Sequence, residues 1–202
     1  DMQLAVSDME IYSYLTPEYM ASKLDVINNA SLCVIDTNLP EETIRYLCEN
    51  CIVPIFADPV STAKAVKLLP VLGKIHTIKP NMLEAALLTG IPVTDERSAR
   101  KAVDILLELG VKQVFLSMGS AGVLYGNARG KKRIPNYPAE VRNTTGAGDS
   151  FMAALVMAYL SEFSTEKAAR CGLAAAAICI EGENTINETL SRQAVLDRIS
   201  EN

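Results

Sequence analysis

Short apolar runs alternate with helical patterns along the first half of this chain, and that alternation limits its fold more than any other feature. Strands are expected over 31–36, 52–57 and 74–78, each followed by a segment with helical signals, and over 111–118. Strands that alternate with helices in this way form βαβ units, in which the strands are parallel and the helices cover the sheet. The pattern therefore predicts one α/β domain over residues 1–202.

Residue types typical of helix ends set the expected helix boundaries. Thr16 and Pro17 are typical of a helix start, and Gly90 and Gly110 of helix ends. Helices are expected to begin at residue 40 and to cover 17–28, 61–72, 81–89, 95–109, 149–160, 165–180 and 191–199. A further strand is expected over 4–9, and an antiparallel pair over 123–125 and 132–137.

Composition excludes several classes of protein. Of the 202 residues, 49% are hydrophobic and the formal net charge is −5, so neither a disordered chain nor a nucleic-acid or anionic-membrane partner is expected. The longest apolar candidate, 172–180, is far shorter than the roughly 18 residues that a membrane-spanning helix needs. A small basic cluster is interpreted as a solvated hairpin turn and consists of Arg129, Lys131, Lys132 and Arg133.

Cysteine usage and the lack of a recognisable signal peptide favour a reducing, cytoplasmic compartment. The five cysteines are Cys33, Cys48, Cys51, Cys171 and Cys179. Cys48 and Cys51 have C-x-x-C spacing, which is compatible with a redox pair or with half of a zinc site. Because the only histidine, His76, lies in an apolar run, the sequence favours thiols that pack as small hydrophobic side chains.

Two glycines precede a predicted helix in the string Asn143-Thr144-Thr145-Gly146-Ala147-Gly148-Asp149-Ser150-Phe151. Small residues let backbone N–H groups approach an anion, and the helix dipole adds partial positive charge at that end. Asp149, held beside such a phosphate cradle, would take a proton from an attacking hydroxyl. The string is equally compatible with a glycine-rich turn in which Asp149 only complements the helix dipole.

Two further motifs follow predicted strands. In Lys79-Pro80-Asn81-Met82-Leu83-Glu84, the side chains of Asn81 and Glu84 are three residues apart and share one helix face. They fit either a capping box or an amide and a carboxylate near Mg²⁺ and its water shell. In Ser117-Met118-Gly119-Ser120-Ala121-Gly122, the glycines are typical of a hairpin and only weakly indicate a nucleotide-binding loop.

Together, these three motifs resemble the ribokinase-like family of carbohydrate and nucleoside kinases, also called the PfkB family. The string 143–151 looks like that family's C-terminal signature, and the other two motifs occur in the family's order. Within the family, the runs 75–80 and 176–191 are most similar to pseudouridine kinases. The resemblance implies a three-layer α/β/α fold with a mostly parallel central sheet. It also implies ATP- and Mg²⁺-dependent phosphorylation of a hydroxymethyl group on a sugar or nucleoside, with pseudouridine as the first acceptor to try.

Carried over position by position, the resemblance implies a role for each motif residue. Asp149 would be the catalytic base, and the anion hole would be formed by Gly146, Ala147 and Gly148. Mg²⁺ would be organised by Asn81, Glu84 and Asp58. The nucleotide would lie along Ser117, Gly119, Gly122, Asn143, Thr144, Asn184 and Asn187, and the segment 183–187 would also flank a monovalent cation such as K⁺.

The family's N-terminal segment and its β lid have no counterpart in this sequence. We therefore expect this chain to be the nucleotide-binding part of a kinase, and whether that part is active by itself stays open. We also expect an exposed sheet edge, which favours self-association. A homodimer is expected for a longer protein of this kind. Three alternatives stay open: a non-catalytic nucleotide-binding or regulatory module, a vitamin kinase acting on hydroxymethylpyrimidine or pyridoxal, and an inert scaffold that uses the fold for protein contacts.

Overall fold

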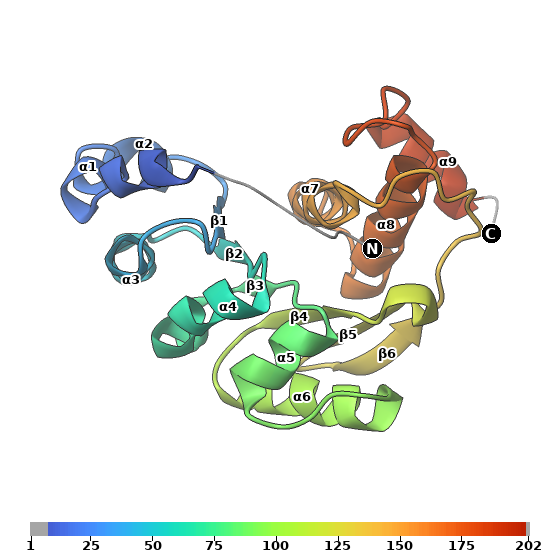
Figure 1. Cartoon of the computed structure of the whole chain (residues 1–202), viewed down its shortest axis with the longest axis horizontal. Coiled ribbons are helices and arrows are strands. Elements are labelled where there is room, and N and C mark those ends of the chain that lie inside the picture. The colour runs from blue at the N-terminus through green and yellow to red at the C-terminus, as the bar shows by residue number, and fades with distance from the viewer. Residues whose placement is uncertain (1–7, 201–202) are drawn as a thin grey trace.

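A six-stranded sheet forms the middle layer in the computed structural model of the chain, which describes residues 8–200 (Figure 1). Its strands lie in chain order as β1 (Cys33–Asp36), β2 (Ile55–Asp58), β3 (Thr77–Ile78), β4 (Gln113–Ser117), β5 (Val123–Asn127) and β6 (Gly130–Ile134). The first four strands are parallel, and β5 and β6 are antiparallel to their neighbours. The predicted mostly parallel sheet is confirmed. The strand expected over 4–9 falls largely outside the described residues.

Helices cover both faces of this sheet (Figure 1). One face carries α3 (Glu41–Asn50), α4 (Thr62–Ala65), the 3₁₀ helix η2 (Val66–Lys74), α5 (Met82–Thr89) and α6 (Glu96–Glu108). The other face carries α7 (Ala147–Leu160) and α8 (Thr165–Ile180), with α9 (Arg192–Ser200) packed on α8. The remaining short elements are η1 (Glu10–Tyr14), α1 (Pro17–Ala21), α2 (Leu24–Asn28) and η3 (Gly119–Ala121). The arrangement is a three-layer α/β/α fold.

Alternate residues of each central strand contribute to two separate hydrophobic cores. In β2, Ile55 and Ala57 pack into the core with α3, α5 and α6, whereas Phe56 packs into the core with α7 and α8. Phe115 of β4 also belongs to the second core, and its neighbour Leu116 to the first. Because side chains alternate across a sheet covered on both faces, successive residues in the middle of these strands are apolar.

Two of the expected helices are broken in the structure. Over 17–28 the chain forms α1 and α2, because the N–H of Lys23 donates to the carbonyl of Met20 in a tight turn. Over 61–72, one α-helical turn passes into η2, which contains Pro70 and therefore lacks one N–H donor. The basic cluster does lie in the β5–β6 hairpin, and its two lysines pair with carboxylates of α6 and α8.

All five cysteines are free thiols. Burial raises the pKa of Cys33 to about 11 and that of Cys48 to about 12, so both thiols stay protonated at neutral pH. Protonated, buried thiols are unreactive, which supports the interpretation of these cysteines as packing residues.

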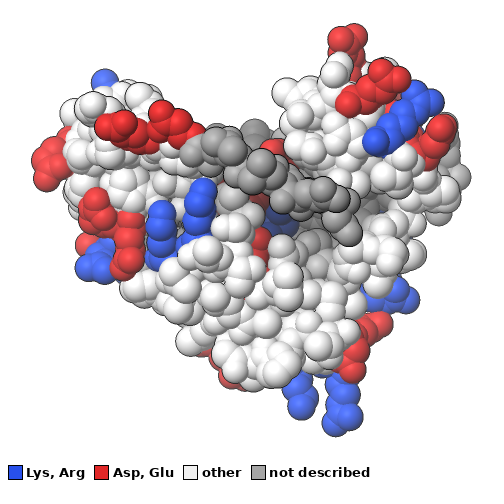
Figure 2. Space-filling model, in the orientation of Figure 1, with Lys and Arg blue, Asp and Glu red and all other residues white. Residues whose placement is uncertain are grey.

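The surface carries charges of both signs. On the face that Figure 2 shows, acidic and basic side chains are interspersed and do not gather into a patch of one sign. Within residues 8–200, every helix is too short or too polar to cross a membrane.

Candidate active site

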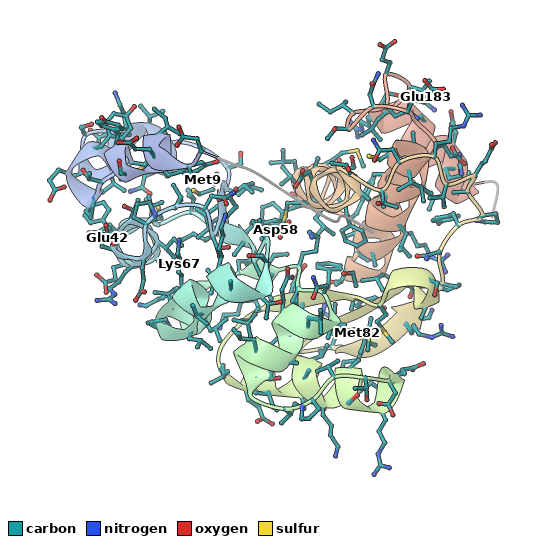
Figure 3. All side chains as sticks on the ribbon, viewed as in Figure 1. Met9, Glu42, Asp58, Lys67, Met82 and Glu183 are labelled. Carbon is teal, nitrogen blue, oxygen red and sulfur yellow. The ribbon has the colours of Figure 1, made fainter. Side chains whose placement is uncertain are left out.

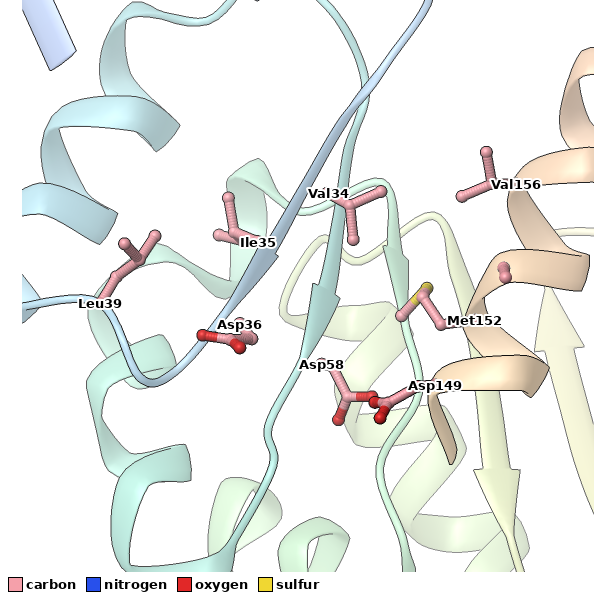
Figure 4. Close-up of a pocket in the computed structure, with 9 residues that line it drawn as sticks. Val34, Ile35, Asp36, Leu39, Asp58, Asp149, Met152 and Val156 are labelled. Carbon is pink, nitrogen blue, oxygen red and sulfur yellow. The ribbon is translucent and has the colours of Figure 1, made fainter. Parts of the chain in front are cut away.

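The carboxyl ends of the parallel strands and the N-terminal end of α7 meet at one edge of the sheet. Strand β1 ends at Asp36, β2 ends at Asp58, and Asp149 lies in the first turn of α7. These carboxylates line a pocket of about 480 Å³ together with Val34, Ile35, Leu39, Met152, Ala153 and Val156. Figure 4 shows the carboxylates of Asp58 and Asp149 facing each other, with Asp36 to one side. Ligands of open α/β sheets bind at this edge.

The glycine string forms the sharp turn that starts α7. Gly146 is the N-cap residue and has a φ of 85°, in the left-handed region. A Cβ atom at this position would overlap the carbonyl oxygen of Thr185, so only glycine lets the two loops approach this closely. The N–H of Ala147 points to the carbonyl of Thr144 at 3.4 Å, and Gly148 follows in the first turn. The first N–H groups of a helix have no acceptor within it, so this end of α7 can receive an anion.

Lys79 follows β3 and is only 8% exposed although it is charged. Its Nζ lies 3.0 Å from Oδ2 of Asp58. The other oxygen of Asp58, Oδ1, accepts the N–H of Val60 at 3.0 Å. The ammonium also borders α7, because a Cβ on Gly148 would lie 3.3 Å from Nζ. The structure thus joins the ends of β2 and β3 to the start of α7 through one ion pair.

Asn81 and Glu84 form a capping box at the start of α5. Oδ1 of Asn81 accepts the N–H of Glu84, and Oε2 of Glu84 accepts the N–H of Asn81, both at 2.9 Å. Glu84 is 3% exposed, and this burial raises the pKa of its carboxyl. The pKa is lowered in part by the hydrogen bond from Asn81 and by Lys79, and raised further by Asp58. The capping-box alternative is therefore realised, and any metal role is additional to it.

The donor set still fits Mg²⁺. An amide and a carboxylate are hard oxygen ligands, and Mg²⁺ keeps several waters and phosphate oxygens when bound to proteins. Within residues 8–200 there is no group of three His, Cys, Asp or Glu residues suited to a metal ion. Such a site would thus depend on Asn81 and Glu84 together with oxygens of a bound phosphate.

The third motif is a turn beside the second. Ser117 ends β4 and forms a parallel bridge with Asn81, which brings the two motifs side by side. Gly119 and Gly122 have φ values of 57° and 93° in the turn to β5. A Cβ on Gly122 would overlap the carbonyl oxygen of Ile134, so this turn packs tightly on β6. The hairpin interpretation is correct, and the hairpin also borders the candidate site.

The asparagines assigned to the nucleotide lie around the loop after α8. Nδ2 of Asn143 donates to the carbonyl of Glu183 at 3.0 Å, and Nδ2 of Asn187 donates to that of Ile178 at 2.6 Å. Asn184 lies in the exposed part of this loop. In Figure 3, Glu183 lies beyond the end of α8, well away from Asp58. These side chains shape the loop, and their contact with a nucleotide stays a prediction.

Two residues at this site have no role in the sequence-based assignment. Asp36 ends an apolar strand as Asp58 does, and that shared sequence pattern is a signal that could have found it. Lys79 stands inside the second motif, where a lysine directly after an apolar strand is unusual. Both side chains lie where the strand ends converge.

A family model and the curated proteins both match this chain to kinases. The model of the pfkB family carbohydrate kinases matches residues 6–192. The pseudouridine kinase of Escherichia coli (strain K12) is 33% identical over 201 residues, covering 98% of this chain and 64% of its own length.

Solved structures agree with the sequence comparison. A putative sugar kinase from Clostridium perfringens superposes with a TM-score of 0.91 at 32% identity, over all of this chain and 64% of that one. Ribokinase from Arabidopsis thaliana, solved in complex with ribose and ATP, gives a TM-score of 0.74 at 27% identity, over 88% of this chain and 58% of that one. The chain therefore spans a little less than two thirds of these relatives' length.

Proposed function

Because this chain belongs to the pfkB family of carbohydrate kinases, we propose that it supplies the ATP-binding and phosphoryl-transfer part of a Mg²⁺-dependent kinase acting on a hydroxymethyl group. The observation that carries this proposal is Asp149 in the first turn of α7, where a potential base adjoins an anion-binding helix end. Phosphoryl transfer needs alignment, charge neutralisation and a group that accepts one proton. This edge of the sheet offers residues for each need.

The proposed reaction uses these residues as follows. Asp149 takes the proton of the acceptor hydroxyl while the hydroxyl oxygen forms a bond to the γ-phosphorus of ATP. The bond from that phosphorus to the β-phosphate oxygen breaks, and ADP leaves. Backbone N–H groups of Gly146, Ala147 and Gly148 stabilise the phosphoryl oxygens during transfer. Mg²⁺, when bound, neutralises charge on the phosphates, and Asn81 and Glu84 are the residues that would hold it.

Pseudouridine is the proposed acceptor, since the E. coli relative with that activity in its name is 33% identical to this chain. Asp36 would receive acceptor hydroxyls on the β1 side of the pocket. Both of its oxygens already accept hydrogen bonds from Asn38, at 2.8 Å each, which fixes the carboxylate. A carboxylate has about four lone-pair positions, so it can accept further bonds. The activity is proposed for the cytoplasm, with K⁺ as a candidate activator at the loop after α8.

A phosphorylation assay tests the proposal directly. The chain is incubated with Mg²⁺-ATP and, separately, pseudouridine, uridine, ribose, hydroxymethylpyrimidine or pyridoxal, and the phosphorylated product is measured. We expect pseudouridine to be turned over fastest. Asp149→Asn should lower turnover by roughly 10²–10⁴-fold and leave the affinity for Mg²⁺-ATP nearly unchanged. Asp25→Asn is the matched control, because Asp25 is also an exposed aspartate in the first turn of a helix but does not line this pocket.

Other outcomes point to the alternatives. Mg²⁺-dependent ATP binding without turnover of any acceptor would favour a non-catalytic nucleotide-binding module. Turnover of pyridoxal or hydroxymethylpyrimidine alone would identify a vitamin kinase. Unchanged turnover in Asp149→Asn would remove the role proposed for that carboxylate.

A further inference from the structure

Lys79 is a buried cation that the mechanism above does not use. We propose that Lys79 is a ligand of the transferred phosphoryl group, and that Asp58 positions this lysine instead of ligating Mg²⁺. This inference rests on the proposed function, because it adds a phosphate ligand to the same site. It also changes the role that the family resemblance implied for Asp58.

The position of the ammonium supports a contact with phosphate. Nζ of Lys79 lies beside Gly148, the second residue of α7, where the unpaired N–H groups of the helix would hold an anion. A lysine ammonium has three hydrogen-bond donors, and Asp58 uses one of them at 3.0 Å. The remaining donors are available to phosphoryl oxygens, and the absent Cβ of Gly148 leaves room for the approach.

The surroundings of Asp58 support a positioning role. Each of its two oxygens has a partner within the protein, Oδ1 the N–H of Val60 and Oδ2 the ammonium of Lys79. Val60 has a φ of 60°, which is unfavourable for a β-branched residue. The turn is held by Pro59, whose carbonyl accepts the hydroxyl of Thr37 and the N–H of Ser61. This turn fixes Asp58 beside Lys79, whose ammonium would be buried without a counter-ion if the carboxylate moved away.

The charge balance of the site supports the same assignment. Asp58, Glu84 and Asp149 place three carboxylates at an edge that would receive the triphosphate of ATP. A buried ion pair contributes little net stability, so stability alone gives no strong reason to keep Lys79 there. A cation fixed among these carboxylates offsets their repulsion of an incoming phosphate.

Calorimetric titration tests this assignment without requiring turnover. Mg²⁺-ATP and Mg²⁺-ADP are titrated into the wild-type chain, Lys79→Met, Lys79→Arg and the control Lys101→Met on the exposed face of α6. Because ADP lacks the γ-phosphoryl group, Lys79→Met should weaken ATP binding by roughly 10–100-fold and ADP binding by less than about threefold. Lys79→Arg should restore most of the difference, and Lys101→Met should bind like the wild type.

Two further variants test the role of Asp58 and keep the test valid if Lys79→Met does not fold. In Asp58→Asn, the Mg²⁺ concentration needed for half-maximal ADP binding should stay unchanged, whereas loss of a metal ligand would raise it. If thermal unfolding shows that Lys79→Met alone is unfolded, the double variant Asp58→Asn/Lys79→Met removes both charges and should show the same selective loss of ATP affinity.

The outcomes separate this inference from the proposed function. Equal losses for ATP and ADP, or no loss, in a folded Lys79 variant would overturn the phosphate-ligand assignment and leave the kinase proposal standing. A folded wild-type chain that binds neither nucleotide would overturn both.

Discussion

At the scale of single residues, the start of α7 depends most on one glycine. Gly146 combines a φ of 85° with a backbone approach to Thr185 that excludes any Cβ. Any side chain here would impose two costs, because the left-handed conformation and the steric overlap are separate effects. Because Gly146 has no side chain, the loop after α8 can pack directly against the backbone of the proposed anion hole.

We expect Gly146→Ala to lower the free energy of unfolding by about 2–4 kcal/mol, which combines about 1–2 kcal/mol for the left-handed conformation with a steric cost. Urea unfolding followed by circular dichroism measures the loss. Gly90→Ala is the control, because Gly90 has a φ of 70° but a Cβ added there would meet nothing within 4 Å. Gly90→Ala should lose only the part of the free energy of unfolding that the left-handed conformation accounts for, about 1–2 kcal/mol. Equal losses in the two variants would show that Thr185 does not constrain this turn.

At the scale of elements, the order and type of the helices and strands follow from the sequence because periodicity and end residues are local signals. Asp58, Asn81 and Asp149 could be predicted as site residues because each follows a strand or starts a helix. The ion pair of Asp58 with Lys79 could not. It depends on β2 and β3 being adjacent with Ala57 opposite Ile78, so that the residues after them meet. Because both faces of β2 are buried and apolar, the hydrophobic pattern of the sequence specifies that register only weakly.

The break in the helix predicted over 61–72 has a local and a non-local cause. The pattern over 61–72 has apolar residues at helical spacing, but Pro70 cannot donate to the carbonyl four residues earlier. Packing of η2 on α3 and α5 then decides the local geometry. Tertiary contacts of this kind override propensity, which contributes only tenths of a kcal/mol per residue, about 0.7 at most for ordinary residues.

Glu84 caps α5 and is also a proposed metal ligand. The pH dependence of the free energy of unfolding separates these two roles. Burial raises the pKa of Glu84, so the folded state binds this proton more tightly than the unfolded chain does. Stability due to Glu84 is therefore full below its unfolded pKa and falls as pH rises through its folded pKa. The ionised form of Glu84 is disfavoured by burial, and a bound cation would offset that cost.

We expect Glu84→Gln to keep the cap, since the amide oxygen can still accept the N–H of Asn81. The variant should become more stable relative to the wild type as pH rises from about 4 to 7, because it lacks the ionisation cost. Its Mg²⁺-dependent nucleotide affinity should fall about tenfold or more. Chemical unfolding across this pH range and calorimetry with Mg²⁺ measure both effects. Parallel pH profiles for variant and wild type would contradict the assigned pKa direction.

At the scale of the whole molecule, the two edges of the sheet differ in chemistry. Strands β1 and β6 are both edge strands, but β6 carries three basic residues whereas β1 is apolar up to Asp36, and its Val34 is 49% exposed. The chain spans 64% of the E. coli pseudouridine kinase, so that relative has more polypeptide than this chain matches. An apolar edge strand with unpaired backbone groups favours pairing with another strand.

We therefore expect the 202-residue chain to self-associate through β1. Sedimentation velocity should show larger species as the concentration rises from roughly 1 to 100 µM, a range in which exposed strand edges promote association. Val34→Lys places a charge on the edge strand and should shift the distribution toward monomer. Val66→Lys, at a similarly exposed valine of η2, is the control and should associate like the wild type. A wild-type chain that stays monomeric over the whole range would mean that β1 is protected in solution.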